Sequence, residues 1–495
     1  MMGRMFQRHT GTSLLLGLAA LCGSEHANAQ NWWTHPYWPS AESIPVSGRP
    51  VPELEWLDDH VREFMSIRNS PNMVFGIMLD GRIVYLRGFG HNHDFQPLPE
   101  NTPFRLASVS KTITAAAARH LISTGAIALG DFVFDRGQPG GGILPSSTYA
   151  PVGAPDTRIG QITVSHLIHH RSGWYAGEHT DGQDFVWYDQ ECAAALGVSS
   201  PPGSTNKIRC ILANPLAFDP GTEAAYSNIN TLILGEVIQH VSGMALEDYV
   251  RTFVMRPAIG IPATEIQGGR TFREWQDPRE PYYRTSNASY TGPWMFPNAF
   301  DNYGPAEVAN PYGAYAVEDA VPFGAFVASA SAMLEFARRY NVAYSETEGS
   351  EFGMPVNGPV ASGGHNGSLP GFESVIEQRE VPGVGSFRFF VATSYRQENN
   401  TLIPNRLLDQ VREALISGEQ VYPDTTSDGF WTSLDSAAPV GVGGFHAPFQ
   451  GVQRMLDQTT AGSKVRLFPG SQNWTGVINT PMVIDAPLGP AVIGQ

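Results

Sequence analysis

The sequence predicts an α/β fold in which one sheet is covered by helices and carries an inserted helical subdomain. Strand-like runs occur near both ends of the chain, at residues 73–79 and 83–89 and again at residues 371–379 and 386–395. The segment between them, residues 112–345, is mostly helix and long loop. If these distant strands pair in one sheet, the segment between them is an insertion in the chain. We therefore expect one domain with a helical insertion.

The first 29 residues have the pattern of a secretory signal peptide. Arg4 and Arg8 precede an apolar run at residues 14–21, and Ala27-Asn28-Ala29 supplies a small-x-small cleavage site. The apolar run is shorter than the roughly 20 residues that a membrane-spanning helix needs, and no other stretch is longer and uninterrupted. We therefore expect a periplasmic or secreted protein without an integral membrane segment after signal removal.

Composition narrows the function classes. The chain has 495 residues, 42% of them hydrophobic and 16% charged, which is typical of a globular protein. Its formal charge of −16 disfavours nucleic acid and anionic membrane surfaces as partners. Outside the signal segment only Cys192 and Cys210 remain, and in an oxidising compartment one disulfide is the simplest interpretation.

Further elements follow from periodicity. Residues 52–69 have the apolar spacing of an amphipathic helix, and Asp80-Gly81 joins the first two strands as a hairpin. The alanine-rich residues 104–123 predict a largely buried helix with Ser108 at or just before its first turn. We also expect helices at residues 231–241 and 405–416.

Ser108 and Lys111 form the strongest candidate for catalysis. Residues three apart on a helix share one face, so the hydroxyl lies beside an amine that burial can deprotonate near neutral pH. The chain has only 3 lysines among its 31 lysines and arginines, yet one of them stands in this apolar helix. Arginine cannot act as a base, whereas a desolvated lysine can.

A second Ser-x-x-Lys match, Ser204 to Lys207, lies in the run PPGSTNK. This composition predicts a loop with no helix to fix the geometry, and we expect no catalytic role there.

Two other constellations can contribute to a site. Tyr226-Ser227-Asn228 lies in a loop before a predicted helix, where a phenol can transfer protons if a neighbouring cation lowers its pKa. The run Gly363-Gly364-His365-Asn366-Gly367-Ser368 leads into the late strands. Its glycines allow a substrate backbone to approach, and His365 offers a positive or hydrogen-bonding edge.

These three motifs, in this order, resemble those of the serine hydrolases that include class C β-lactamases, D-Ala-D-Ala carboxypeptidases, D-aminopeptidases and family VIII esterases. The similarity extends to the segments DGRIVYLRGFG, ITVSHLIHHRSGW, FDPGTEAAYSN and GAFVASASAMLEFA and covers residues 51–418. It implies a β-lactamase/transpeptidase-like fold, with an antiparallel sheet covered by helices and an all-helical subdomain. It implies no metal or organic cofactor.

The resemblance also implies roles for individual residues. Ser108 would be the acylated nucleophile, Lys111 its activating neighbour and Tyr226 the second proton-transfer group. Asn228 would contact Lys111 and the substrate amide. The third motif, which includes His365 and Gly367, would bind substrate, and the backbone N–H groups of Ser108 and Ser368 would form the oxyanion hole.

His365 occupies the position where β-lactamases of this group carry lysine. A His-x-Gly motif is more similar to the D-peptidases, D-aminopeptidases and several esterases of the family, so a β-lactamase is the less favoured interpretation. His166, His169 and His170 could suggest zinc, but packing and hydrogen bonding is the better explanation for them.

Two regions depart from the family pattern. Residues 265–322 form a long aromatic insertion that could be either a lid on the site or an ordered loop packed on the helical subdomain. Residues 419–495 form a C-terminal extension of unknown role after the hydrolase domain at residues 30–418, with a helix expected at 449–457 and strands at 465–468 and 476–484.

The sequence thus predicts an exported serine hydrolase that forms an acyl-enzyme. The favoured substrates are small peptides with D-residues or nonstandard linkages, including linearised cyclic peptides. A carboxylesterase is the alternative, because esters and amides pass through similar oxyanions. A penicillin-binding sensor that is acylated and then stalls is a further alternative.

Overall fold

The computed structural model of the chain describes residues 38, 40–175, 184–255, 265–286, 295–382, 384–397, 403–416, 430–433, 449–459, 463–467, 470–472, 474–479, 481–485 and 491–493. The expected signal segment, residues 1–29, lies outside this part of the chain. Within it, no helix is both long and apolar enough to cross a bilayer.

The centre of the molecule is a six-stranded sheet in which all neighbouring strands are antiparallel. Its order is β1 (Val46–Ser47), β3 (Arg82–Gly90), β2 (Asn72–Leu79), β12 (Gly385–Thr393), β11 (Phe372–Val381) and β10 (Gly363–Leu369). Strands from the two ends of the chain meet where β2 pairs with β12. The predicted sheet of distant pieces is therefore confirmed.

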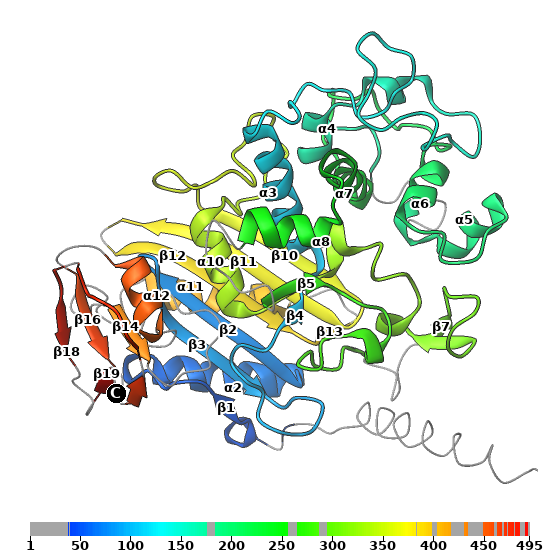
Figure 1. Ribbon diagram of the computed structural model, residues 1–495. Coiled ribbons are helices and arrows are strands. Elements are labelled where there is room, and N and C mark those ends of the chain that lie inside the picture. Colours follow the sequence, from blue (N-terminus) through cyan, green and yellow to red (C-terminus); the bar gives the residue numbers. More distant parts are fainter. Residues whose placement is uncertain are drawn as a thin grey trace, which may run out of the picture.

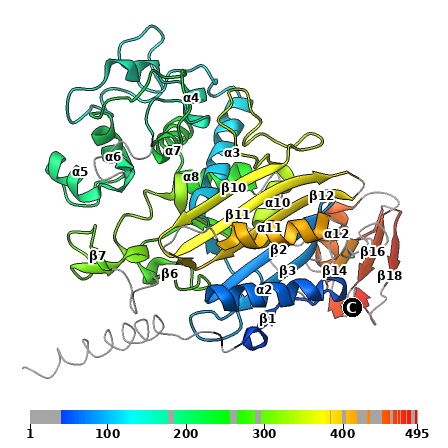
Figure 2. The ribbon, with the colours of Figure 1, turned by 180° about the vertical axis from the view of Figure 1, so that it is seen from behind.

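Side chains alternate across this sheet and build two cores. On β2, Phe75 and Ile77 face the core shared with α2 (Glu55–Arg68) and α11 (Ile403–Ile416). Val74 and Met78 face the other core, which includes side chains of α10 (Ala330–Arg339). Figure 2 shows α2 and α11 in front of the sheet, on the face opposite to α3 and α10.

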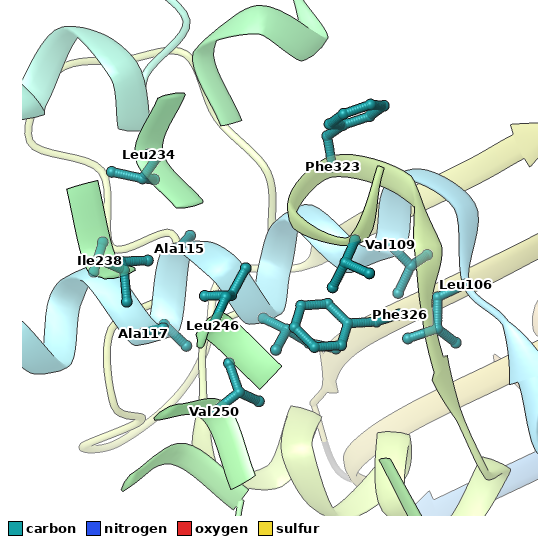
Figure 3. Packing of buried hydrophobic residues seen from close by; sticks show 14 of the residues in the cluster. Leu106, Val109, Ala115, Ala117, Leu234, Ile238, Leu246, Val250, Phe323 and Phe326 are labelled. Carbon is teal, nitrogen blue, oxygen red and sulfur yellow. The ribbon is translucent and has the colours of Figure 1, made fainter. Parts of the chain in front are cut away.

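Helix α3 (Ser110–Ser123) crosses from the sheet into the helical part of the molecule (Figure 1). Its alanines are buried because small side chains let neighbouring elements pack closely on all sides. Figure 3 shows Ala115 and Ala117 of this helix among side chains from α7 (Asn228–Ser242) and α8 (Leu246–Tyr249). A largely buried helix at this point agrees with the prediction.

The helical subdomain lies above one end of the sheet in Figure 1 and also contains α4 (Val164–Ile168), α5 (Asp189–Leu196) and α6 (Ser204–Ile211). The predicted disulfide is present and joins Cys192 on α5 to Cys210 on α6. Closing a loop of 18 residues in this way stabilises the fold by about 3 kcal/mol in the chain-entropy treatment.

The second Ser-x-x-Lys match corrects one prediction. Ser204 and Lys207 lie on helix α6 rather than in a loop, because Ile208 and Ile211 bury an apolar face. The Lys207 ammonium is buried and forms ion pairs with Asp189 at 2.7 Å and Asp319 at 3.3 Å. The Ser204 hydroxyl donates to Glu236, so the two residues of this match have separate partners.

The aromatic insertion contains short paired strands. β5 (Ile266–Gly268) and β4 (Phe104–Arg105) flank β9 (Phe326–Ala328), β6 (Arg284–Ser286) pairs with β13 (Tyr395–Gln397), and β7 (Met295–Pro297) pairs with β8 (Glu307–Ala309). Tyr283 is buried against Ala107 and Phe372, while Trp275 and Tyr303 are exposed. The described parts of the insertion are thus packed, partly beside the turn that precedes α3, and a lid function stays a hypothesis.

The C-terminal extension forms a small parallel sheet of β15 (Phe449–Gln450), β14 (Phe430–Ser433), β16 (Lys464–Leu467) and β18 (Val483–Asp485), with α12 (Gly451–Gln458) packed on it. β17 (Gly470–Gln472) pairs with β19 (Ala491–Ile493). Val452, Met455, Val465 and Leu467 form a separate core. The helix expected at 449–457 begins two residues later than predicted, at Gly451. Of the strand expected at 476–484, residues 476–479 are irregular, and β18 begins at Val483.

Candidate active site

A strained turn presents Ser108 at the start of α3. The preceding residue, Ala107, has a φ of 46°, a left-handed conformation that is uncommon for residues other than glycine. The turn is held from the sheet side, because the Ser374 hydroxyl donates to the carbonyl of Leu106 at 2.5 Å. Ser108 itself is half-buried, whereas its neighbours Ala107 and Val109 are buried. The hydroxyl therefore projects from a fixed backbone.

Lys111 lies directly against this hydroxyl. Its Nζ is 2.9 Å from Ser108 Oγ and donates to the carbonyl of Phe323 at 2.6 Å. The side chain is 1% exposed, and this burial lowers the pKa of the amine from 10.5 to about 7. Near neutral pH, a substantial fraction of Lys111 is the free amine, which can accept the proton of Ser108.

The second motif lies at the start of helix α7. Ser227 caps this helix, with its hydroxyl accepting from the N–H of Ile229 at 3.2 Å. Lys111 Nζ lies 5.0 Å from the ring centroid of Tyr226. The Ser108 hydroxyl lowers the pKa of the Tyr226 phenol against the effect of burial. The motif thus brings its phenol to the nucleophile.

Two details of the second motif differ from the prediction. Burial raises the pKa of Tyr226, so a cation does not lower it and the phenol keeps its proton at neutral pH. The expected contact of Asn228 with Lys111 does not occur among the hydrogen bonds of the described residues. The backbone N–H of Asn228 donates to Asp184 Oδ2 at 2.8 Å, which places this residue against a buried carboxylate.

The third motif, which was expected to lead into the late strands, itself forms β10, the edge strand of the sheet. A Cβ on Gly367 would come within 2.6 Å of the backbone nitrogen of Ser108, so only glycine lets this strand approach the nucleophile so closely. Ser368 follows it, and its hydroxyl donates to Glu373 at 3.0 Å.

His365 contributes no positive charge to the site. The side chain is buried, and this burial, reinforced by Lys111, lowers its pKa to about 3. Its Nδ1 lies 2.7 Å from the carbonyl of Asn366, which can only accept, so Nδ1 carries the proton of the neutral ring. The sequence left two roles open for His365, a positive charge or a hydrogen-bonding partner. The neutral ring agrees with the hydrogen-bonding role.

Sequence reasoning missed an aromatic cluster beside these motifs. The ring centroid of Tyr344 lies 5.0 Å from that of His365 and 5.9 Å from that of Tyr226. The Phe352 ring lies 5.5 Å from Tyr344 and 6.2 Å from His365. His170 stacks on Tyr226 with ring centroids 4.8 Å apart. Tyr344 has no motif around it that could have indicated this position, since only the folded chain brings it next to β10.

The other two histidines have local partners. His166 accepts from the N–H of Thr163 in a capping box at the start of α4. His169 bonds the carbonyl of Ser165 at 2.9 Å. Among the described residues, no group of three or more histidine, cysteine or carboxylate side chains is arranged to hold a metal ion.

Asp184 was also missed. It is 4% exposed and precedes the short helix Phe185–Trp187, for which it supplies the cap. Burial raises the pKa of this carboxyl to about 6, while Lys111 and the N–H of Asn228 act in the opposite direction. Its only sequence signal is an aspartate before an apolar turn, which is typical of any helix cap.

Comparison with known proteins agrees with this geometry. The model of the family described as Beta-lactamase matches residues 57–369, which is more than half of the chain. The chain belongs to this family. The match includes all three motifs, from the turn at Ser108 to the edge strand at Gly367, and ends before the C-terminal extension.

Two curated relatives of this Beta-lactamase family member are named for different activities. It is 27% identical over 229 residues to a putative D-alanyl-D-alanine carboxypeptidase of Escherichia coli (strain K12), covering 44% of this chain and 48% of that protein. It is 30% identical over 190 residues to esterase EstB of Burkholderia gladioli, covering 36% of this chain and 42% of that protein. The chain thus matches just under half of the length of these relatives.

A solved structure supports the same fold. D-amino acid amidase from Ochrobactrum anthropi aligns with 74% of this chain and 98% of its own length, with a TM-score of 0.50 and 18% identity. At this identity the likeness concerns the fold alone, and it agrees with the predicted β-lactamase/transpeptidase-like architecture.

Proposed function

We propose that this chain is an exported serine hydrolase that forms a covalent acyl-enzyme on Ser108. The observation that carries the proposal is the buried amine of Lys111, whose Nζ lies 2.9 Å from Ser108 Oγ and whose pKa is lowered to about 7. A nucleophile in contact with a base that is free near neutral pH is the arrangement that acyl transfer needs. Export is supported by the signal-like start of the sequence and by the disulfide.

In the proposed mechanism, the Lys111 amine takes the proton of Ser108 while Oγ forms a bond to the substrate carbonyl carbon. The carbonyl electron pair moves to oxygen, where the N–H groups of Ser108 and Ser368 stabilise it. The tetrahedral intermediate collapses by breaking the bond to the leaving group, which receives a proton through Lys111 or the neutral phenol of Tyr226. Water then attacks the ester, and Ser108 regains its proton.

We infer that the substrates are amides of small peptides with D-residues or nonstandard linkages, including linearised cyclic peptides. The relative named as a putative D-alanyl-D-alanine carboxypeptidase supports this class. The neutral His365 disfavours a β-lactamase, because a ring without charge gives no attraction for the carboxylate of a β-lactam. A carboxylesterase is the second candidate, favoured by the similarity to esterase EstB.

The proposal is tested with matched p-nitrophenyl esters and p-nitroanilides that carry the same D- or L-aminoacyl group. We expect turnover of the anilides with a preference for D-residues, and none by Ser108→Ala protein of unchanged thermal transition. Turnover of the esters alone would make carboxylesterase the correct function. One stoichiometric burst without turnover would identify an acylated sensor and refute the enzyme.

A further inference from the structure

Asp184 is a buried carboxylate that the three motifs do not include. Its Oδ2 accepts the N–H of Asn228 at 2.8 Å and lies 3.5 Å from the hydroxyl of Ser227. Its Oδ1 accepts the N–H of Val186 at 3.5 Å. One side chain therefore ties the short helix Phe185–Trp187 to the start of α7, where the second motif stands.

The same carboxylate acts on Lys111 through space. Its negative charge raises the pKa of the Lys111 amine against the effect of burial, and the Lys111 charge lowers the pKa of Asp184 in return. In a buried site the attraction is weakly screened. The charge of Asp184 thus keeps the pKa of Lys111 near 7. Without this charge, burial would lower the pKa further and the amine would lose its proton at a lower pH.

The other titratable groups around Lys111 act differently. His170 and His365 are both buried, and the Lys111 charge lowers the pKa of each, so both rings are neutral at neutral pH. Tyr226 is a neutral phenol because burial raises its pKa. Among the described groups that face Lys111 from α7, β10 and the segment after α4, none offers the negative charge that Asp184 offers.

We propose that Asp184 is the positioning residue of this site, which fixes the Tyr226-Ser227-Asn228 turn and supplies the buried counter-charge of Lys111. The inference rests on the proposed function, because it assigns Lys111 as the base. The Asp184 side chain makes two contributions. Its oxygens accept hydrogen bonds that shape the turn, and its charge sets the pH at which Lys111 becomes an active base.

Two substitutions separate these contributions. Asp184→Asn keeps an oxygen that accepts the Asn228 N–H but removes the charge, and asparagine caps helices as well as aspartate does. Asp184→Ala removes both. Asp156→Asn is the matched control, because Asp156 caps the helix Thr157–Gln161 in the same way and pairs with Arg158 instead of acting on Lys111.

The readout is the rate at which a fluorophosphonate probe phosphonylates Ser108, with loss of fluoride, between about pH 5 and 9, followed by intact mass. For wild type and Asp156→Asn we expect an acidic limb near pH 7. For Asp184→Asn the limb moves to lower pH by roughly one unit, with a thermal transition close to wild type. Asp184→Ala should lower both the rate and the thermal transition.

An acidic limb of Asp184→Asn that coincides with wild type would overturn the counter-charge. An Asp184→Ala protein with the wild-type rate and thermal transition would overturn the positioning role. Failure of the proposed function looks different, since Ser108 of the wild-type protein would then remain unmodified at every pH.

Discussion

Replacing Lys111 with methionine should abolish hydrolysis while making the folded protein more stable near neutral pH. The reason is that the folded protein holds this amine in a site with 1% exposure, where the ammonium is poorly solvated. A pKa that falls from 10.5 to about 7 corresponds to about 5 kcal/mol, at 1.36 kcal/mol for each pKa unit. Methionine has a similar length and carries no charge.

The sign and the pH window follow from proton linkage. Between pH 7 and 10.5 the unfolded chain holds the Lys111 proton more tightly than the folded protein does, so the stability of wild type rises with pH in this interval. The destabilisation by Lys111 is about 4 kcal/mol at pH 7 and about 1 kcal/mol at pH 9.5. The stability advantage of Lys111→Met should therefore shrink by about 3 kcal/mol over this range.

Urea denaturation of both oxidised proteins at pH 7 and pH 9.5, followed by tryptophan fluorescence, measures this difference. Methionine makes no hydrogen bond to Phe323 or Ser108, which offsets part of its gain in stability. The change with pH comes mainly from the ionisation of Lys111, with a smaller part near pH 7 from Asp184, whose pKa the Lys111 charge lowers. A difference between the two proteins that is the same at both pH values would refute a lysine that burial holds near neutrality.

Three more substitutions test other parts of the account. Lys111→Arg should reduce kcat at least 100-fold although it keeps the charge, because arginine stays protonated; a mild effect in steady-state assays would show that deprotonation is not its role. Gly367→Ala should lower activity strongly, since its Cβ would meet the Ser108 nitrogen at 2.6 Å, and wild-type kcat/KM would contradict that approach. Cys192→Ser with Cys210→Ser should lose about 3 kcal/mol in urea denaturation, and unchanged stability would contradict the bridge's contribution.

The sequence predicted those parts of the site that short motifs carry. Ser108 and Lys111 are close in the chain, so helix geometry alone brings them together, and the apolar neighbours of Lys111 indicated its burial. β10 was not predicted as a strand because Gly363–Leu369 is rich in glycine, and its pairing with β11 is what makes it extended. The segment PPGSTNK was expected to be a loop for a similar reason, since the apolar residues Ile208 and Ile211 that make α6 a helix lie beyond it.

Asp184 and Tyr344 could not be found from the sequence. Each lies near the motifs only because the helical subdomain and the sheet edge meet around Lys111, and no local pattern records that contact. The same holds for the low pKa of His365, which comes from burial and from the Lys111 charge rather than from its neighbours in the chain. Residue types in a motif indicate which chemistry is available, whereas their protonation states depend on the folded environment.

The most direct test of the account is the mass of the protein during turnover of a slow ester or amide, quenched in acid. We predict an adduct equal to the acyl group of the substrate on the peptide that contains Ser108, with none on Ser108→Ala protein. The adduct should form and decay at rates consistent with kcat. Turnover without any adduct, or an adduct on another residue, would contradict acyl-enzyme catalysis by Ser108.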